Sequence, residues 1–492
     1  MLRKKIASSI VLMMILCLAT SYVHGILSFK TIQSIAGPIN GTLGLKAYYE
    51  QERDTVELLI LGSSHAYKDV NSAVLYDEYG ISSYVLGGPV QSFWNSYFYL
   101  IEALKNQHPK LVVLEGHAAT MNTNYKVHAD IVRNTLCIKD IKTRIGAIVA
   151  SAPRDKIDDY IFSYRLWHTR YQEINEFDFQ NYWERPCFEY FKGSEMLFST
   201  QACECPDVES FQGTAEINRK EELYFRKIIE LCQQQEIPVM VIISPWAVTE
   251  NAQQRYNYLE SVALEYQIPF INYNSEEAYD RMALDFGNDM MDIGHLNYRG
   301  GVKYTNVLGE DIQNYIPLSD HRGDARYSSW EMNSKDIHAR IADFEIASAT
   351  TCDELAAAFD GSIHSMYLYA ISDTDRICEN TGMFDKLEIK SDLLQDGELY
   401  LMNNLPCRQI SDDGLQWEYE EFFDGKWLSV KSGLLVSDSR MVDEKYLVFD
   451  GKQYVDSQQG IYLFIYDNFT KEFVGVKHVR MNGDGDVEIL NK

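Results

Sequence analysis

The feature that most constrains the fold is a regular alternation of short apolar runs and helical patterns, which begins at residue 56. Each apolar run is bounded by polar or turn-forming residues, as buried parallel strands are. The expected strands are residues 56–61, 83–86, 111–114, 238–243 and 269–272. The expected helices are residues 92–107, 215–236 and 251–266. Strands that alternate with helices predict a doubly wound α/β domain with a parallel sheet of five strands.

The alternation covers only part of the 492 residues, and a chain of this length usually has more than one hydrophobic core. Residues 55–317 are expected to form the α/β domain, interrupted by an aromatic-rich insertion at residues 120–214. Residues 31–54 would be a linker. Within residues 318–492, a helical stretch at 334–360 is followed by strand-like runs between Asp, Gly and Asn turns. This pattern is typical of a mixed α+β, β-rich domain.

The N-terminal segment is long and apolar enough to cross a bilayer. Basic residues at positions 3–5 precede a run from Ile6 to Phe29 that contains no Asp, Glu, Lys or Arg. Such a basic cluster stays in the cytoplasm, so we expect residues 1–30 to be a single-pass anchor in the cell membrane, with the rest of the chain extracytoplasmic. A cleaved signal peptide and a secreted protein are the alternative, because small residues at positions 19–25 suit a cleavage site.

Composition narrows the range of partners. The formal net charge is −27, from 72 acidic and 45 basic residues, and such a surface repels phosphate backbones, which argues against nucleic acid. Of nine cysteines, Cys17 lies in the apolar N-terminal run, and the even number that remains permits disulfides. Cys and His spacings typical of zinc sites are not found, so neither a metal nor another cofactor is expected.

Two short segments carry side chains suited to acyl transfer. Residues 61–65 read Leu-Gly-Ser-Ser-His and follow the first expected strand, and residues 292–297 read Asp-Ile-Gly-His-Leu-Asn. A serine hydroxyl becomes a nucleophile when a histidine takes its proton, and that histidine needs a carboxylate to fix its tautomer. An Asp three residues before a His can present both side chains to one point. The two segments therefore predict a Ser–His–Asp site.

Both segments resemble the SGNH (GDSL-like) hydrolase family, which has a flavodoxin-like sheet, a serine after the first strand and a late Asp-x-x-His motif. The resemblance covers residues 55–315 approximately and implies that Ser64 is the nucleophile. It further implies His295 as the general base and Asp292 as the carboxylate that orients it, with Ser63 as the alternative nucleophile. The Gly-Ser-Ser form is similar to the branch that includes the D-alanyl-transfer protein and polysaccharide O-acetylation proteins.

The oxyanion donors of the family are matched in part. The resemblance implies that the backbone N–H groups of Ser64 and Gly87 are donors. The family's Gly-x-Asn-Asp motif corresponds here to Glu115-Gly116-His117-Ala118, so the asparagine is missing and His117 is the candidate to replace it. Loss of one such donor typically lowers turnover by about 10²–10³-fold.

Candidate substrate contacts are His65, beside the nucleophile, and Trp167 and His168 in the insertion. The favoured interpretation of the insertion's aromatic rings is that they pack it onto the domain. Because flat apolar rings also offer stacking surfaces, a carbohydrate-facing wall is the alternative.

Together these features imply a membrane-tethered serine esterase or acyltransferase that acts on acyl groups of cell-envelope or extracellular polysaccharide through an acyl-Ser64 intermediate. A transferase would need a partner such as a multispanning membrane acyl donor. The alternative is a non-catalytic SGNH-fold surface binding or scaffold protein, which the missing asparagine favours. Residues 445–479 weakly resemble an interleukin-like β-rich module, which carries no chemistry of its own.

Overall fold

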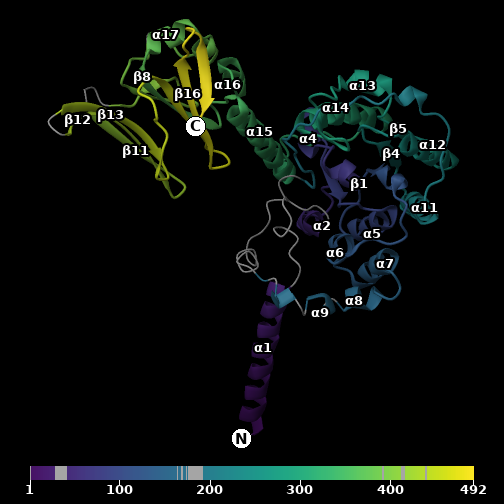
Figure 1. The fold of residues 1–492 in the computed structure, drawn as a ribbon. Coiled ribbons are helices and arrows are strands. Elements are labelled where there is room, and N and C mark those ends of the chain that lie inside the picture. Colours follow the sequence, from purple (N-terminus) through teal and green to yellow (C-terminus); the bar gives the residue numbers. More distant parts are fainter. Residues whose placement is uncertain are drawn as a thin grey trace. The chain divides into compact units, whose positions relative to one another are not determined.

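The computed structural model describes residues 2–27, 42–162, 164–167, 170–172, 174, 192–390, 393–411, 416–437 and 440–492. The chain forms two compact units, Met1–Ser334 and Lys335–Lys492 (Figure 1). A parallel sheet organises the first unit and antiparallel sheets organise the second. The expected fold class, an α/β domain followed by a β-rich α+β domain, is confirmed.

Five parallel strands form the centre of the first unit, in the order β2-β1-β3-β4-β5. They are β1 (Leu58–Gly62), β2 (Ser83–Gly87), β3 (Leu111–Glu115), β4 (Val239–Ile243) and β5 (Phe270–Asn272). The first four strands are buried throughout, which explains why their sequences are continuous apolar runs. Because β2 and β3 lie on opposite sides of β1, the strand order switches there, and ligands of such sheets bind beyond the carboxyl ends at this point.

Helices flank this sheet. They are α4 (Ser72–Tyr79), α5 (Phe93–Ala103), α7 (Ile141–Ser151), α11 (Arg219–Gln234), α12 (Glu250–Glu265), α13 (Glu276–Met282) and α14 (Tyr298–Tyr315). α4 packs against α14, and α5 packs against α7 and α11. The side chains of Thr249 and Asn297 accept hydrogen bonds from the first turns of α12 and α14, where N–H groups have no partner within the helix.

The insertion expected at residues 120–214 is helical over much of its described length. Besides α7, its helices are α6 (His128–Thr135), α8 (Ile157–Ile161) and α9 (Tyr164–Trp167). A small apolar cluster that includes Ile131, Ile148 and Tyr160 holds this region together. Residues 175–191, which contain several of the insertion's aromatic residues, lie outside the described residues.

The first unit extends beyond residues 55–317 at both ends. Within the segment expected to be a linker, α2 (Thr42–Tyr48) buries Leu45 in the core of the unit. At the other end, α15 (Ser328–Ser348) begins earlier than expected, and Nε1 of the buried Trp330 donates to Ser83 O at 2.8 Å. Single buried residues in polar segments produce no periodic pattern, so the sequence did not indicate that Leu45 and Trp330 are buried.

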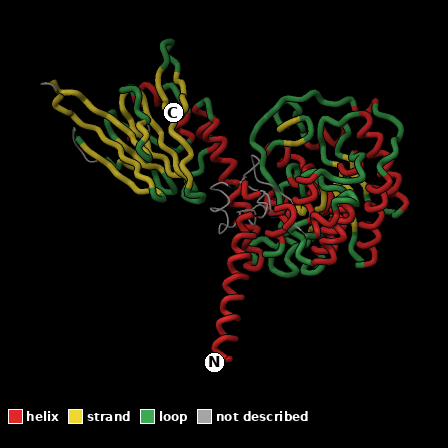
Figure 2. The backbone as a smooth tube through the Cα atoms, turned by 60° about the horizontal axis from the view of Figure 1, so that its bottom comes forward, coloured by secondary structure: helices red, strands yellow, loops and turns green. Residues whose placement is uncertain are grey.

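Antiparallel strands dominate the second unit (Figure 2). Its six-stranded sheet has the order β10-β9-β8-β15-β16-β17 and its four-stranded sheet the order β11-β12-β13-β14. The strands are β8 (His364–Ser372), β9 (Leu399–Met402), β10 (Arg408–Gln409), β11 (Trp417–Phe423), β12 (Lys426–Ser437), β13 (Arg440–Phe449), β14 (Lys452–Gln453), β15 (Gly460–Asp467), β16 (Glu472–Met481) and β17 (Val487–Asn491).

The six-stranded sheet is covered on both faces. Side chains along β8 alternate between two apolar clusters, with Leu368 in one and Tyr369 in the other, as the two-residue period of a strand requires. The first cluster includes residues of α16 (Cys352–Ala358), α17 (Thr374–Glu379) and α18 (Met383–Lys386). The second cluster includes Leu428 and Leu447 of the four-stranded sheet. The second unit is therefore built of three layers.

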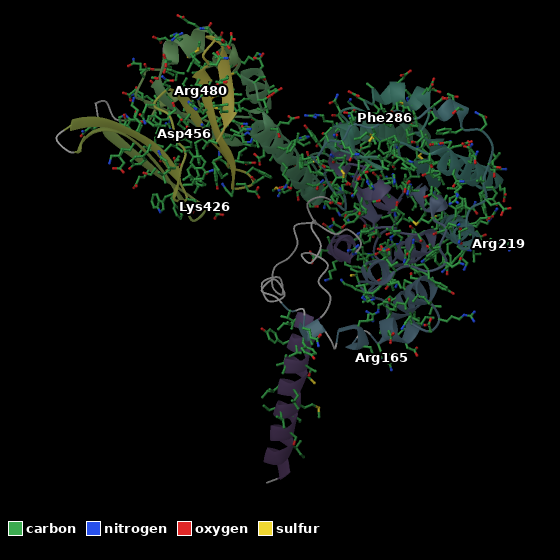
Figure 3. All side chains as sticks on the ribbon, viewed as in Figure 1. Arg165, Arg219, Phe286, Lys426, Asp456 and Arg480 are labelled. Carbon is green, nitrogen blue, oxygen red and sulfur yellow. The ribbon has the colours of Figure 1, made fainter. Side chains whose placement is uncertain are left out.

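Among the described helices, α1 (Leu2–Leu27) is the one that is long and apolar enough to cross a membrane. The stretch Ser9–Leu27 has a mean hydropathy of 2.2, and its apolar side chains from Ile10 to Val23 are exposed (Figure 3). This finding rests on length and composition, which a signal sequence near the N-terminus shares.

Eight of the nine cysteines lie in described residues, and all eight carry free thiols. The disulfides that the even count permits are therefore not formed among these eight.

Candidate active site

Ser64 lies at the carboxyl end of β1, beside the switch point of the sheet. β1 ends at Gly62, Ser63 is extended, and Ser64 is the first residue of α3 (Ser64–Tyr67). A Cβ atom on Gly62 would lie 2.7 Å from Glu115 Cβ and 2.8 Å from Ala66 Cβ, so a side chain there would push α3 away from the sheet. The glycine lets the strand turn sharply into the helix, which leaves Ser64 partly exposed at the edge of the sheet.

Asp292 and His295 are presented by a two-stranded hairpin. β6 (Met290–Asp292) and β7 (His295–Leu296) pair so that Asp292 lies opposite His295. The Gly294 N–H donates to Asp292 Oδ1 at 2.7 Å, which fixes the carboxylate within the turn. The Ala247 N–H, in the loop after β4, donates to Ile293 O at 3.1 Å. The tight turn is thus anchored to the carboxyl edge of the parallel sheet.

The structure brings Ser64, His295 and Asp292 together. His295 Nε2 lies 2.9 Å from Ser64 Oγ, and His295 Nδ1 lies 3.0 and 3.1 Å from the two oxygens of Asp292. The side chain of His295 is 18% exposed and that of Asp292 is 35% exposed, so solvent reaches the site. Partial burial alone would raise the pKa of Asp292, but hydrogen bonds from His295 and the Gly294 N–H hold that pKa below its ordinary value. Asp292 is therefore ionised beside the imidazole near neutral pH.

Ser63 points into the protein. Its side chain is buried, and its hydroxyl lies 3.5 Å from Glu115 Oε2, at the limit of a hydrogen bond. Of the two adjacent serines, the one in contact with His295 is Ser64.

A pair of stacked imidazoles lies next to this group. His65 is 3% exposed, and its ring stacks on that of His117 with centroids 3.8 Å apart. The His65 ring centroid is 5.0 Å from that of His295. Burial lowers the pKa values of His65 and His117 well below the ordinary histidine value, and the positive charge of a nearby histidine adds to the effect. Both rings are therefore neutral near pH 7, and a contact of His65 with substrate stays a prediction.

Two buried carboxyl groups hold the elements of the site in place. Asp69 Oδ1 accepts the N–H of Leu296, the residue after His295, at 2.9 Å. Glu115 Oε1 accepts the His117 N–H at 2.8 Å. Burial raises the pKa of each carboxyl group to about 8, so both are largely protonated at neutral pH. Neither residue was predicted from the sequence, although Asp69 lies four residues after His65 and Glu115 is the last residue of β3.

The three expected oxyanion donors differ in their availability. The N–H of Ser64 belongs to the first turn of α3, where a helix offers no acceptor. The Gly88 N–H donates to Gly62 O at 3.4 Å, and because successive N–H groups along a strand alternate in direction, that of Gly87 points away from β1. His117 Nδ1 lies 3.0 Å from the Tyr256 hydroxyl and Nε2 lies 3.5 Å from Thr120 Oγ1, so Nε2 has the weaker protein contact of the two nitrogens.

Trp246, which was not predicted from the sequence, packs its ring beside the two stacked imidazoles. Its ring centroid lies 5.6 Å from that of His65 and 5.5 Å from that of His117. It follows β4 through Ser244 and Pro245, and its position after an expected strand was the available signal. The two aromatic candidates from the insertion cannot be placed, because His168 and the side chain of Trp167 lie outside the described residues.

The last part of the insertion, residues 192–214, also lies near the site. The Glu195 N–H donates to Tyr67 O at 2.6 Å, and the Gln201 N–H donates to Met290 O at 2.9 Å. The Cys203 N–H donates to the carbonyl of Phe286, which Figure 3 labels, at 2.8 Å. This segment therefore connects the serine helix α3 with the hairpin of Asp292 and His295.

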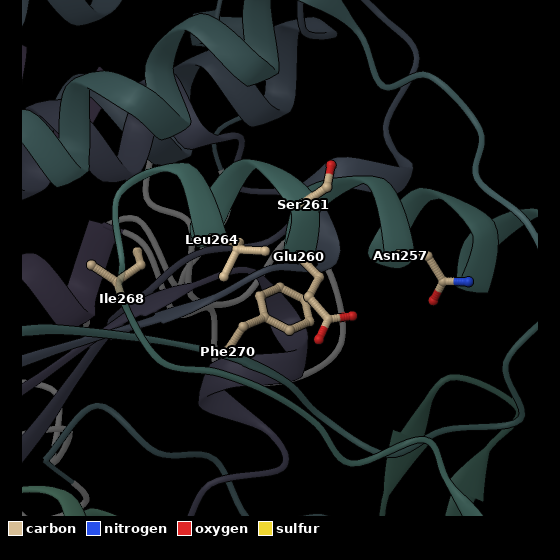
Figure 4. A pocket seen from close by; sticks show the side chains of 6 residues that line it. All are labelled: Asn257, Glu260, Ser261, Leu264, Ile268 and Phe270. Carbon is tan, nitrogen blue, oxygen red and sulfur yellow. The ribbon is translucent and has the colours of Figure 1, made fainter.

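A surface pocket elsewhere in the first unit is separate from this group. It is lined by Asn257, Glu260, Ser261, Leu264, Ile268 and Phe270 (Figure 4). Phe270 opens β5, so the pocket lies at the amino ends of the strands, opposite the edge that carries Ser64. Among its six lining residues, no serine or cysteine is hydrogen-bonded to a histidine or another base.

Comparisons with known proteins do not assign the chain to a family. No protein-family model and no curated protein sequence matches the chain. One solved structure, described as "a putative acylhydrolase" from Bacteroides fragilis, is similar over 58% of this chain and 99% of its own, with 12% identity and a TM-score of 0.26. A TM-score this low supports no inference about function. The fold and the site define an α/β protein with a Ser–His–Asp group at the carboxyl edge of its sheet, and what that group does follows from its geometry.

Proposed function

We propose that this chain is an SGNH-type serine esterase or acyltransferase with Ser64, His295 and Asp292 as its catalytic triad. The observation that carries the proposal is the 2.9 Å contact between His295 Nε2 and Ser64 Oγ, with Asp292 on the opposite ring nitrogen. This is the arrangement in which an imidazole can take a proton from a serine hydroxyl and share the resulting charge with a carboxylate.

The first half of the reaction forms an acyl-enzyme. As Ser64 Oγ attacks the carbonyl carbon of an ester, its proton passes to His295 Nε2, and Asp292 stabilises the imidazolium through Nδ1. The N–H groups of Ser64 and Gly87 would donate hydrogen bonds to the carbonyl oxygen as its negative charge develops, with His117 Nε2 as a third candidate donor. His295 then gives its proton to the leaving alkoxide.

The second half decides between hydrolase and transferase. Water or a sugar hydroxyl gives its proton to His295 and attacks the acyl-Ser64 carbonyl. As the bond from the acyl carbon to Ser64 Oγ breaks, His295 returns the proton to Ser64 Oγ, which regenerates the free serine. The partial exposure of His295 and Asp292 lets water reach the site, so hydrolysis is the expected reaction of the chain alone. Transfer would require an acceptor sugar that displaces this water.

The cellular setting belongs to the same proposal. If α1 anchors the chain, the triad would face an extracytoplasmic surface, where acylated polysaccharide of the cell envelope is the substrate class we favour. Trp246, beside His65 and His117, is an aromatic surface on which a sugar ring could stack. A multispanning membrane protein would be the acyl donor of a transferase.

Replacing the nucleophile tests the assignment. We expect Ser64→Ala to lower kcat for acetyl esters by at least about 10³-fold, because a triad without its nucleophile retains only the oxyanion hole and binding. Ser63→Ala is the matched control, and we expect it to keep more than a tenth of the activity. Turnover by Ser64→Ala at the wild-type rate would refute the proposal.

A second candidate is a non-catalytic surface binding or scaffold protein with the same fold. It is favoured by the Glu115-Gly116-His117 sequence in place of the family's asparagine motif and by the contact of His117 Nδ1 with Tyr256. A scaffold would bind acylated oligosaccharide, turn over no ester, and bind equally well as Ser64→Ala.

A further inference from the structure

One imidazole and two carboxyl groups meet in the second unit, far along the chain from Ser64. His364 opens β8, Asp467 closes β15, and the two residues face each other across the antiparallel pair. Asp343, on α15, places its Oδ1 3.0 Å from His364 Nε2. Ligand atoms of all three residues lie within 4.8 Å of one another. Three separate elements thus contribute groups that suit metal coordination.

The cluster is closed and contains excess negative charge. His364 and Asp467 are fully buried, and the side chain of Asp343 is 17% exposed. Asp467 Oδ1 accepts N–H groups from Phe469 and Thr470, whereas its Oδ2 is buried and accepts no hydrogen bond from any described residue. A buried carboxylate without a partner is costly, by several kcal/mol before compensation. The unpartnered oxygen of Asp467, with the second carboxyl group of Asp343 beside it, therefore favours a bound cation.

The imidazole can offer its lone pair to such a cation. His364 Nδ1 lies 3.1 Å from Asp360 O, and a ring N–H that donates to a carbonyl leaves the other nitrogen free, as in many metal-bound histidines. The Asp360 N–H lies 3.2 Å from the same Nδ1, so the competing arrangement has Nε2–H donating to Asp343. In that arrangement the carboxyl groups of Asp343 and Asp467 would share a proton, because they lie within hydrogen-bonding reach of each other.

We propose that Asp343, His364 and Asp467 bind a divalent transition-metal ion of the Zn²⁺ type, which ties α15 to β8 and β15. An imidazole with two carboxylates suits Zn²⁺ better than Ca²⁺ or Mg²⁺, which prefer oxygen ligands alone. The 4.8 Å limit on the separation of the ligand atoms is close to the diameter of a zinc coordination sphere, about 4 Å. The exposed edge of Asp343 leaves room for water as a fourth ligand.

This site is independent of the proposed catalytic function and lies in a different unit. It also departs from the sequence-based expectation of no metal. That expectation relied on short Cys and His spacings, whereas these ligands come from a helix and two strands that are distant in the sequence.

Metal analysis of the full, untagged chain tests the proposal. After chelation and dialysis against Zn²⁺, we expect about one bound ion per chain, and at least a tenfold weaker response to Mg²⁺ and Ca²⁺. Asp467→Asn and His364→Gln should abolish binding. Asp343→Asn, at the partly exposed ligand, should weaken it at least tenfold and decides the outcome if the buried variants fail to fold. His108→Gln is the control, because it removes an imidazole from an exposed His–Asp pair.

A local readout distinguishes this site from adventitious zinc elsewhere. Zn²⁺ should slow amide hydrogen exchange in β8 and β15 and raise the unfolding midpoint by about 5 °C or more. Wild-type chain that takes up no Zn²⁺, or uptake that persists in Asp467→Asn and Asp343→Asn, would overturn the proposal and leave a hydrogen-bonded His–Asp cluster.

Discussion

Each unit contains an Asp–His pair with a 3.0 Å contact, but the surroundings of the two pairs differ. In the first unit, one carboxylate faces one partly exposed imidazole, whose other nitrogen meets the Ser64 hydroxyl. In the second unit, His364 is fully buried and two carboxyl groups surround it. A balanced, accessible pair suits proton transfer, whereas a closed group with excess negative charge suits a bound cation. Burial and the number of carboxylates, rather than the residue types, therefore decide whether an Asp–His pair suits proton transfer or cation binding.

The largest expected effect is that of Asp292→Asn on catalysis. An amide cannot stabilise the imidazolium and favours the wrong tautomer of His295, so kcat should fall by about 10⁴-fold. Steady-state ester hydrolysis measures this effect. Asp353→Asn, at an exposed residue of the second unit, is the control and should change kcat less than threefold, by about the noise expected of a surface substitution. If Asp292→Asn kept more than a tenth of the wild-type activity, the Asp292–His295 pair would not be the proton-transfer pair of a catalytic triad.

Gly87→Ala should have a smaller effect on catalysis. The added Cβ would lie 3.1 Å from Gly62 O and from Tyr67 Cδ1, which crowds the turn that carries Ser64. We expect kcat/KM to fall about 10–100-fold, within the range for a disturbed oxyanion donor. Gly382→Ala, where no atom lies within 4 Å of the added carbon, should leave kcat/KM unchanged. Equal activity of Gly87→Ala and Gly382→Ala would show that the added carbon at Gly87 does not disturb the turn that carries Ser64.

A chelator should affect the stability of the second unit but not the activity of the first. EDTA is expected to leave ester hydrolysis within about twofold of its starting value, because the triad needs no metal. The same treatment should lower the unfolding midpoint of the second unit by about 5 °C. Scanning calorimetry and an activity assay on the same sample would measure both. Loss of turnover on chelation would mean that the metal requirement lies in the first unit.

The smallest expected effect concerns the pH dependence of stability. Asp69 and Glu115 have pKa values raised by burial to about 8, so the folded state holds protons that the unfolded state releases near pH 4. Stability should therefore fall as pH rises between about 4 and 8. Asp69→Asn and Glu115→Gln should flatten this slope in unfolding measurements at pH 5.5 and 7.5. An unchanged slope would show that both carboxyls are already ionised.

The sequence predicted the parallel sheet because its strands are buried on both sides and appear as apolar runs. It also predicted Ser64, Asp292 and His295, because each lies in a short motif next to an expected strand. Asp69 and Tyr256 were missed, because separate elements supply them and no local pattern marks a residue that meets a distant partner. Asp343, His364 and Asp467 were missed for the same reason, and Leu45 and Trp330 show that single buried residues escape periodicity. Trp246 was missed although it follows an expected strand.

The most direct test of the central claim is covalent labelling with a fluorophosphonate, which reacts with a serine that a histidine activates. Mass spectrometry of the labelled chain should place the adduct on Ser64, with labelling at least tenfold slower in His295→Ala. An unlabelled wild-type chain, or an adduct whose rate does not depend on His295, would contradict the claim that these two side chains act together.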